Sequence, residues 1–152
     1  MRRGWFVEGL SGAQFAMPGG VDGLRAATAE EPLVLSALDP ANAWGALLPW
    51  PESPGTASPR RATGSVVVLH GGEPLLWLPR SGKSMVTFPA ARESERLAQG
   101  LLLLKARLSR FFDRSLVVAQ VDGAPATETP LVETLLAGGF QIEDGRLRLV
   151  DF

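Results

Sequence analysis

Few side chains in this 152-residue sequence are suited to covalent or acid–base chemistry. The absence of cysteine excludes thiol nucleophiles, disulfides and thiolate zinc sites. The single histidine, His70, would have to serve any catalytic triad or histidine metal site alone, and the serines show no Gly-x-Ser-x-Gly elbow. Because His70 is followed by Gly-Gly-Glu, we expect an exposed histidine in a turn rather than a general base.

A Ser-Gly-Lys-Ser segment, Ser81 to Ser84, resembles the end of a phosphate-binding loop. Such a loop needs a glycine five residues before its Gly-Lys pair, and that position here is Trp77. The segment also lies between two apolar runs that predict strands, whereas a phosphate loop leads into a helix. We therefore expect a basic hairpin turn without an ATP site.

The charged residues are distributed unevenly along a chain whose net charge is −1. The segment 80–114 has eight basic and three acidic residues, whereas 122–152 has six acidic and two basic ones. Two interpretations remain open, a helix face that follows a phosphate backbone and a solvated face that docks the acidic C-terminal part. The candidate phosphate contacts in this segment are Arg80, Lys83, Arg92, Arg96, Arg107 and Arg110, beside Lys105 and Arg114.

Tryptophans offer a second means of binding nucleic acid, because bases stack on exposed aromatic rings. Trp44 and Trp50 lie in a loop-like segment and are the candidates, whereas Trp77 is in the middle of an apolar run and is expected in the core. The alternative for Trp44 and Trp50 is ordinary packing.

The elements that would position these residues follow from the hydrophobic pattern. Near-continuous apolar runs at 65–69, 74–78 and 85–88 predict a meander buried on both faces. Spacings of 4, 3, 4 and 3 predict one helix over 90–112, in which Gly100 indicates close packing. The apolar stripe of that helix consists of Leu97, Leu101, Leu104, Leu108 and Phe111.

Shorter elements surround this centre. Strands are expected at 33–38 and 116–121, and hairpins at 3–8 with 13–17 and at 140–142 with 146–150. Short helices are expected at 21–27 and after Thr129, the latter with Thr129 as N-cap and Pro130 at its first position. The fold class is therefore α+β, an antiparallel, partly closed, β-barrel-like sheet with one long and two short helices.

Composition supports an ordinary globular chain, with 45% hydrophobic and 20% charged residues. No run of about 18 apolar residues is present, and no signal-peptide core follows the N-terminus. We expect a soluble, cytoplasmic protein with no membrane partner.

Two strings carry a resemblance to a known family. Residues 2–19, RRGWFVEGLSGAQFAMPG, closely resemble the wing of a winged-helix domain in the large helicase-related (Lhr) family. Residues 39–51, DPANAWGALLPWP, resemble the same family's entry into its C-terminal barrel. The resemblance implies a winged-helix remnant with hairpin and short helix at 1–30, and a β-barrel-like C-terminal module at 31–152.

Members of this family are ATP-dependent 3′–5′ helicases that translocate on single-stranded DNA and are linked to DNA repair. The resemblance implies that this chain is the last part of a longer protein, with winged-helix and motor domains upstream as intramolecular partners. ATP and magnesium would be held by those motor domains, and no cofactor or metal is expected here. The family's C-terminal region has also been assigned uracil glycosylase activity, for which Asp151 is the one carboxylate near the chain end that could match.

Three functions are carried forward. The first is a non-catalytic module that contacts single-stranded DNA or a DNA-containing duplex, with Arg2 and Arg3 of the wing near the phosphates. The second is a DNA glycosylase in which Asp151 activates water or stabilises the sugar cation. The third is an oligomerisation module that forms a homo-oligomer through Trp44, Leu47 and Trp50.

Overall fold

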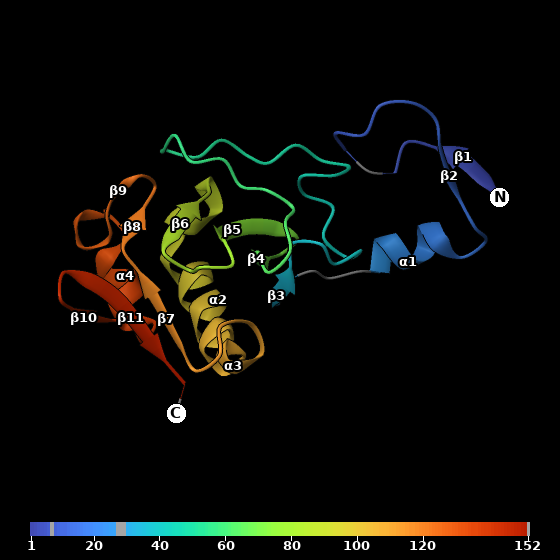
Figure 1. Cartoon of the computed structure of the whole chain (residues 1–152). Helices are drawn as coiled ribbons and strands as arrows, with labels where there is room; N and C mark the ends of the chain where they lie inside the picture. Colours follow the sequence, from blue (N-terminus) through green and yellow to red (C-terminus); the bar gives the residue numbers. More distant parts are fainter. Residues whose placement is uncertain (7, 27–29, 152) are drawn as a thin grey trace.

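A mixed sheet forms the centre of the molecule (Figure 1). The computed structural model describes residues 1–6, 8–26 and 30–151. Within them the larger sheet has the strand order β3-β4-β5-β6-β8-β9, and all its pairs are antiparallel except β6–β8. Its strands are β3 (Pro32–Ser36), β4 (Val66–His70), β5 (Glu73–Leu78), β6 (Ser84–Thr87), β8 (Gln120–Val121) and β9 (Ala124–Pro125).

The predicted burial of the central meander on both faces is confirmed. Every residue of β4 is buried, as is every residue of β5 after Glu73. Trp77 is in the core as predicted, and its indole Nε1 donates a hydrogen bond to the carbonyl of Arg60. A strand buried on both faces needs apolar side chains at consecutive positions, which accounts for the runs in the sequence.

The predicted long helix is present in three pieces. A 3₁₀ turn η1 (Pro89–Arg92) precedes α2 (Ser94–Ala106), and a short α3 (Leu108–Phe111) follows it. The helix breaks at Arg107, whose N–H is shared between the carbonyls of Leu103 and Leu104 and whose ψ is 7°. The apolar stripe is nevertheless confirmed, since its four leucines are fully buried.

The C-terminal part forms a smaller sheet of order β10-β11-β7, and α4, which precedes β10, packs against α2. The strand expected at 116–121 is divided at Ala119, because β7 joins this sheet while β8 joins the larger one. Neither sheet closes on itself in the described residues, so the barrel-like closure is not confirmed, although the α+β class is. The remaining elements here are β7 (Ser115–Val118), η2 (Ala126–Glu128), α4 (Val132–Ala137), β10 (Gln141–Glu143) and β11 (Arg146–Val150).

Two local expectations need correction. The sheet is not wholly antiparallel, because the crossover through α2, α3 and β7 is long enough to return β8 parallel to β6. Thr129 is not the N-cap of the helix, which begins at Val132 after an N-cap at Leu131. Its hydroxyl instead accepts a hydrogen bond from the Leu131 N–H, stabilising the turn that leads into the helix.

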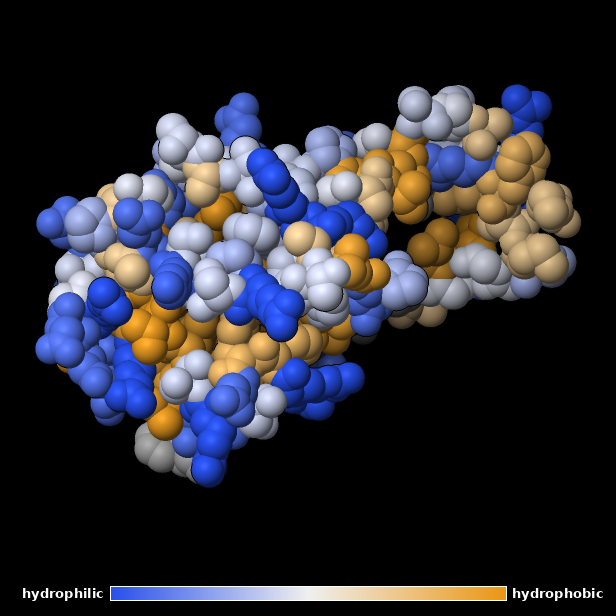
Figure 2. Space-filling view, viewed as in Figure 1, coloured by the Kyte–Doolittle hydropathy of each residue, from blue (hydrophilic) through white to orange (hydrophobic). Residues whose placement is uncertain are grey.

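The N-terminal part extends away from this body (Figure 1). It holds the predicted hairpin, β1 (Arg2–Gly4) and β2 (Gln14–Ala16), followed by α1 (Gly20–Ala26). Val7 of the expected strand and Ala27 of the expected helix lie outside the described residues. Apolar side chains are exposed here, among them Trp5, Phe15 and Met17, and Figure 2 shows tan and orange surface over this part.

None of the helices in the described part of the chain has the length and apolarity needed to cross a bilayer.

Replacing Gly100 by alanine should destabilise the protein by about 1–2 kcal/mol, although alanine is the better helix former by about 1 kcal/mol. A Cβ at this position would lie 2.7 Å from Leu75 Cδ1 and 3.0 Å from Val68 Cγ1. Urea unfolding measures the change. Gly23→Ala in α1 is the control, since its Cβ would meet nothing within 4 Å, and it should be neutral or stabilising. Equal effects at the two glycines would contradict this packing.

Candidate nucleic-acid interface

Tertiary structure divides the predicted basic set into two groups at opposite ends of α2. The helix has 13 residues and is therefore about 20 Å long. Arg92 and Arg96 lie around its start, whereas Arg107 and Arg110 lie around and beyond its end. One continuous row of cations along a single helix face is therefore not formed.

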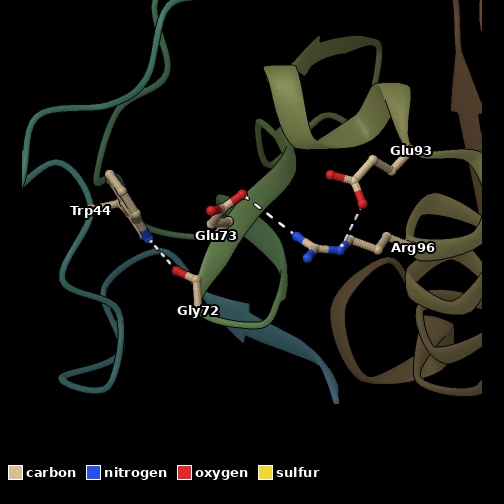
Figure 3. Close-up of polar contacts among 5 residues, drawn as sticks. All are labelled: Trp44, Gly72, Glu73, Glu93 and Arg96. Carbon is tan, nitrogen blue, oxygen red and sulfur yellow. Dashed lines mark hydrogen bonds and ion pairs between the residues drawn. The ribbon is translucent and has the colours of Figure 1, made fainter. Parts of the chain in front are cut away.

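Charges of the opposite sign surround the first group. The Arg96 guanidinium lies 3.0 Å from the Glu93 carboxylate and 3.6 Å from that of Glu73 (Figure 3). Arg92 is exposed and borders a pocket that also contains three carboxylates. Arg96 is therefore paired with carboxylates, whereas Arg92 forms no ion pair among the described residues but lies at a pocket with an excess of acidic side chains.

The second group gathers cations from two separate segments. The turn that holds Lys83 packs on β7 and on the residue after α3, because a Cβ at Gly82 would lie 2.4 Å from Leu116 Cδ1 and 3.6 Å from Phe112 Cδ1. Gly82 also has a φ of +69°, which favours glycine. We call Lys83, Arg107, Arg110 and Arg114 the basic end; among the described residues none of the four forms an ion pair, and all four are exposed.

The other predicted cations lie elsewhere. Arg80 is exposed, with its aliphatic stem over Gly64, where a Cβ would lie 2.6 Å from its Cγ. Arg2 and Arg3 are exposed on β1, in the N-terminal hairpin. The structure thus places the turn of Lys83 against β7 and Phe112, which follow α3, while Arg2 and Arg3 lie in the N-terminal hairpin.

Both candidate stacking tryptophans make contacts inside the protein. The Trp44 indole Nε1 donates a hydrogen bond of 2.9 Å to the Gly72 carbonyl in the β4–β5 turn (Figure 3). The Trp50 ring stacks on Phe88, with centroids 5.7 Å apart and planes within 5°. Both indoles are half-buried, so each has only part of its surface left for a base.

His70 is buried, and the expectation of an exposed turn histidine is wrong. It is the last residue of β4, is 7% exposed, and its Nε2 lies 2.7 Å from the Gln99 Oε1 on α2. The ladder continues through the His70–Glu73 pair, so the turn itself is only Gly71-Gly72. The His70 side chain therefore connects β4 to α2 and does not face solvent.

The Ser-Gly-Lys-Ser segment is the predicted hairpin turn. It joins β5 to β6, so the element that directly follows Lys83 is a strand and not a helix. The carbonyl of Lys83 accepts hydrogen bonds from the N–H groups of Ala119 and Gln120. This geometry does not fit a nucleotide phosphate, and no cluster of three metal-binding side chains occurs within 1–6, 8–26 and 30–151.

Asp151 lies next to the basic end. It follows β11, is half-buried, and its N–H donates a hydrogen bond of 3.1 Å to the carbonyl of Arg114. It lines neither the pocket beside Asp122 nor the smaller one between β3 and α3. A substrate of Asp151 would lie beside Arg114.

A pocket that the sequence did not reveal lies at the other end of the larger sheet. It has a volume of about 580 Å³, and Asp122, in the turn between β8 and β9, is at its base. The Asp122 carboxylate accepts hydrogen bonds from the Thr87 N–H at 2.8 Å, the Thr87 hydroxyl and the Ser53 hydroxyl. The Asp-Gly pair signals a turn in sequence, but nothing local indicates these partners.

Comparison with known proteins finds the same family that residues 2–19 and 39–51 resemble. Residues 1–34 match the family described as large helicase-related protein, winged-helix domain. The Lhr helicase/uracil glycosylase of Escherichia coli is 40% identical over 146 residues, covering 91% of this chain and 9% of that protein. The Lhr helicase/probable uracil glycosylase of Mycolicibacterium smegmatis is 35% identical over 163 residues, covering 97% and 11%.

These matches define a class of large, helicase-related proteins that contain a winged-helix domain. The chain belongs to the large helicase-related (Lhr) family and corresponds to the C-terminal region of an Lhr helicase. It spans only about a tenth of the length of the curated relatives it matches.

Asp122→Ala should cost about 2–4 kcal/mol of unfolding free energy, because it removes three hydrogen bonds to a carboxylate and leaves the N–H of buried Thr87 without a partner. The matched control is Asp144→Ala, which also lies in a two-residue Asp-Gly hairpin turn, with φ 50° against 53° for Asp122. The strain of alanine at positive φ is common to both. Urea unfolding with equal losses for the two variants would show that the Asp122 contacts contribute nothing.

Proposed function

We propose that this chain is a nucleic-acid-contacting module of an Lhr-type, ATP-dependent 3′–5′ DNA helicase that acts in DNA repair. The observation that carries the proposal is the basic end, four exposed cations without carboxylate partners in the described residues. Exposed cations without carboxylate partners bind phosphates by releasing counterions. The substrate would be single-stranded DNA or a duplex that contains it.

The upstream part of the same protein is the second proposed partner. The hairpin β1–β2 exposes Trp5 and Phe15, and an isolated two-stranded hairpin is marginally stable in water. Helices of the winged-helix domain would cover these rings, and the motor domains would lie beyond. Arg2 and Arg3 would then extend the DNA contact from the wing, and the division at 1–30 and 31–152 remains our proposal for the domains.

A second candidate function is excision of uracil from DNA. Both relatives carry uracil glycosylase in their names, the second as probable. Asp151 beside Arg114 is the position at which a carboxylate would meet DNA bound on the basic end. There it would activate water or stabilise the developing positive charge on the sugar.

The third function, assembly of a homo-oligomer, stays a prediction. Leu47 is 67% exposed and offers an apolar contact. Trp44 and Trp50, however, already make contacts within the chain, a hydrogen bond to Gly72 and a ring stack on Phe88 respectively.

The double variant Arg107→Gln/Arg110→Gln should make the salt dependence of binding to single-stranded DNA less steep. The slope of the logarithm of the binding constant against the logarithm of the salt concentration should become less negative by up to about 1.4, since each lost phosphate contact removes about 0.7. The measurement is fluorescence anisotropy of a labelled oligonucleotide over a salt series. The control, Arg92→Gln/Arg96→Gln, removes the same charge from the compensated group and should leave the slope unchanged. The same change in both doubles would show that the basic end has no special role, and no change in the first would remove it from the DNA interface.

Asp151→Asn should abolish release of uracil from single-stranded DNA while DNA affinity changes little, because the amide cannot accept a proton or balance a sugar cation. Alkaline cleavage of a uracil-containing strand measures release, and anisotropy on the same strand measures binding. Asp144→Asn, in the exposed β10–β11 turn, is the control. The glycosylase proposal would be wrong if Asp151→Asn still released uracil, or if the unaltered chain released none. Neither result would contradict the proposal of DNA binding.

A further inference from the structure

The cavity beside Asp122 contains none of the residues of the basic end and plays no part in the proposed function. Its volume of about 580 Å³ is within the range of about 300–1,000 Å³ that is usual for ligand sites. Its walls come from four segments: the loop 52–54, the end of β6 with η1, the β8–β9 turn, and the turn before α4. Much of the lining is apolar, from Pro54, Phe88, Pro89, Val121 and Leu131.

The polar groups around this cavity have a strong bias of charge. Glu52, Asp122 and Glu128 line it together with one cation, Arg92, which leaves an excess of two negative charges at neutral pH. Glu52 and Glu128 are exposed at the rim, while Asp122 is half-buried. A phosphate group would be repelled here, so this cavity and the basic end select ligands of opposite charge.

The deep carboxylate is held rigidly. Asp122 accepts three hydrogen bonds from Thr87 and Ser53, and the loop lies directly on its backbone, since a Cβ at Gly55 would come within 2.4 Å of the Asp122 carbonyl oxygen. Thr129, which is 6% exposed, also lines the cavity and uses its hydroxyl oxygen as acceptor for the Leu131 N–H. The walls are thus preformed, which lowers the entropic cost of binding.

We propose that this cavity binds an arginine side chain presented by a segment of a partner protein. The apolar walls suit the three-carbon stem, and carboxylates at the rim and base suit the planar guanidinium, whose N–H groups pair with two carboxylate oxygens at once. The volume exceeds one side chain and leaves room for the flanking backbone. This proposal does not rest on DNA binding.

The test is an NMR titration of the ¹⁵N-labelled chain with the blocked tripeptide acetyl-Ala-Arg-Ala-amide. The matched peptide with citrulline in place of arginine has the same shape without the charge. We expect millimolar binding of the arginine peptide, with amide shifts confined to the segments around Ser53, Thr87, Asp122 and Thr129, and no binding of the citrulline peptide. Absence of shifts, shifts elsewhere, or equal shifts with both peptides would overturn the proposal.

Variants at the rim keep the test independent of folding. Glu52→Gln and Glu128→Gln alter exposed side chains and should each weaken the arginine peptide about two- to fivefold, as expected for one exposed carboxylate partner. Asp122→Asn should weaken it further. Asp144→Asn, the same substitution in the other Asp-Gly turn, should change nothing. Unchanged affinity in both rim variants, or an equal loss in Asp144→Asn, would overturn the assignment.

Discussion

The arrangement of the whole body depends on how closely α2 lies against the larger sheet. At Gly100 the helix backbone approaches β4 and β5 so nearly that a methyl group would collide with Leu75. Leu97 and Leu104, one turn either side of Gly100, are fully buried, as is the adjacent Leu101. Dense packing of this kind permits few alternatives, so the position of the helix determines where its two ends emerge.

A neighbouring face of the same helix contacts α4. A Cβ at Gly138, after α4, would lie 2.5 Å from Leu101 Cδ1, so α4 also packs against α2, and Leu147 and Leu149 of the smaller sheet belong to the same buried cluster as Leu101. The helix therefore lies between two open sheets that share no strand. The chain passes from one sheet to the other most directly at Ala119, between β7 and β8, where the hydrogen bond from the Ala119 N–H to the Lys83 carbonyl holds the crossing in place.

A consequence of this arrangement is electrostatic. Both ends of α2 carry arginines, but Arg96 meets Glu93 and the strand residue Glu73, whereas Arg107 and Arg110 meet no carboxylate in the described residues. Residues of like charge in one sequence segment thus acquire different surroundings. Exposed, unpaired cations and an acidic cavity thus occur on a chain of nearly zero net charge.

The amino-acid sequence by itself determined the local features: the buried meander, the leucine stripe, the hairpin turns and the two strings that carry the family resemblance. These follow from side-chain periodicity and turn chemistry, which act within a few residues. Only the tertiary structure decided the burial of His70, the division of strand 116–121, the separation of Arg92 and Arg96 from Arg107 and Arg110, and the pocket at Asp122. Asp122 and Asp144 occupy matching Asp-Gly turns, yet only Asp122 meets Thr87 and Ser53, because those contacts depend on segments 35 and 69 residues away.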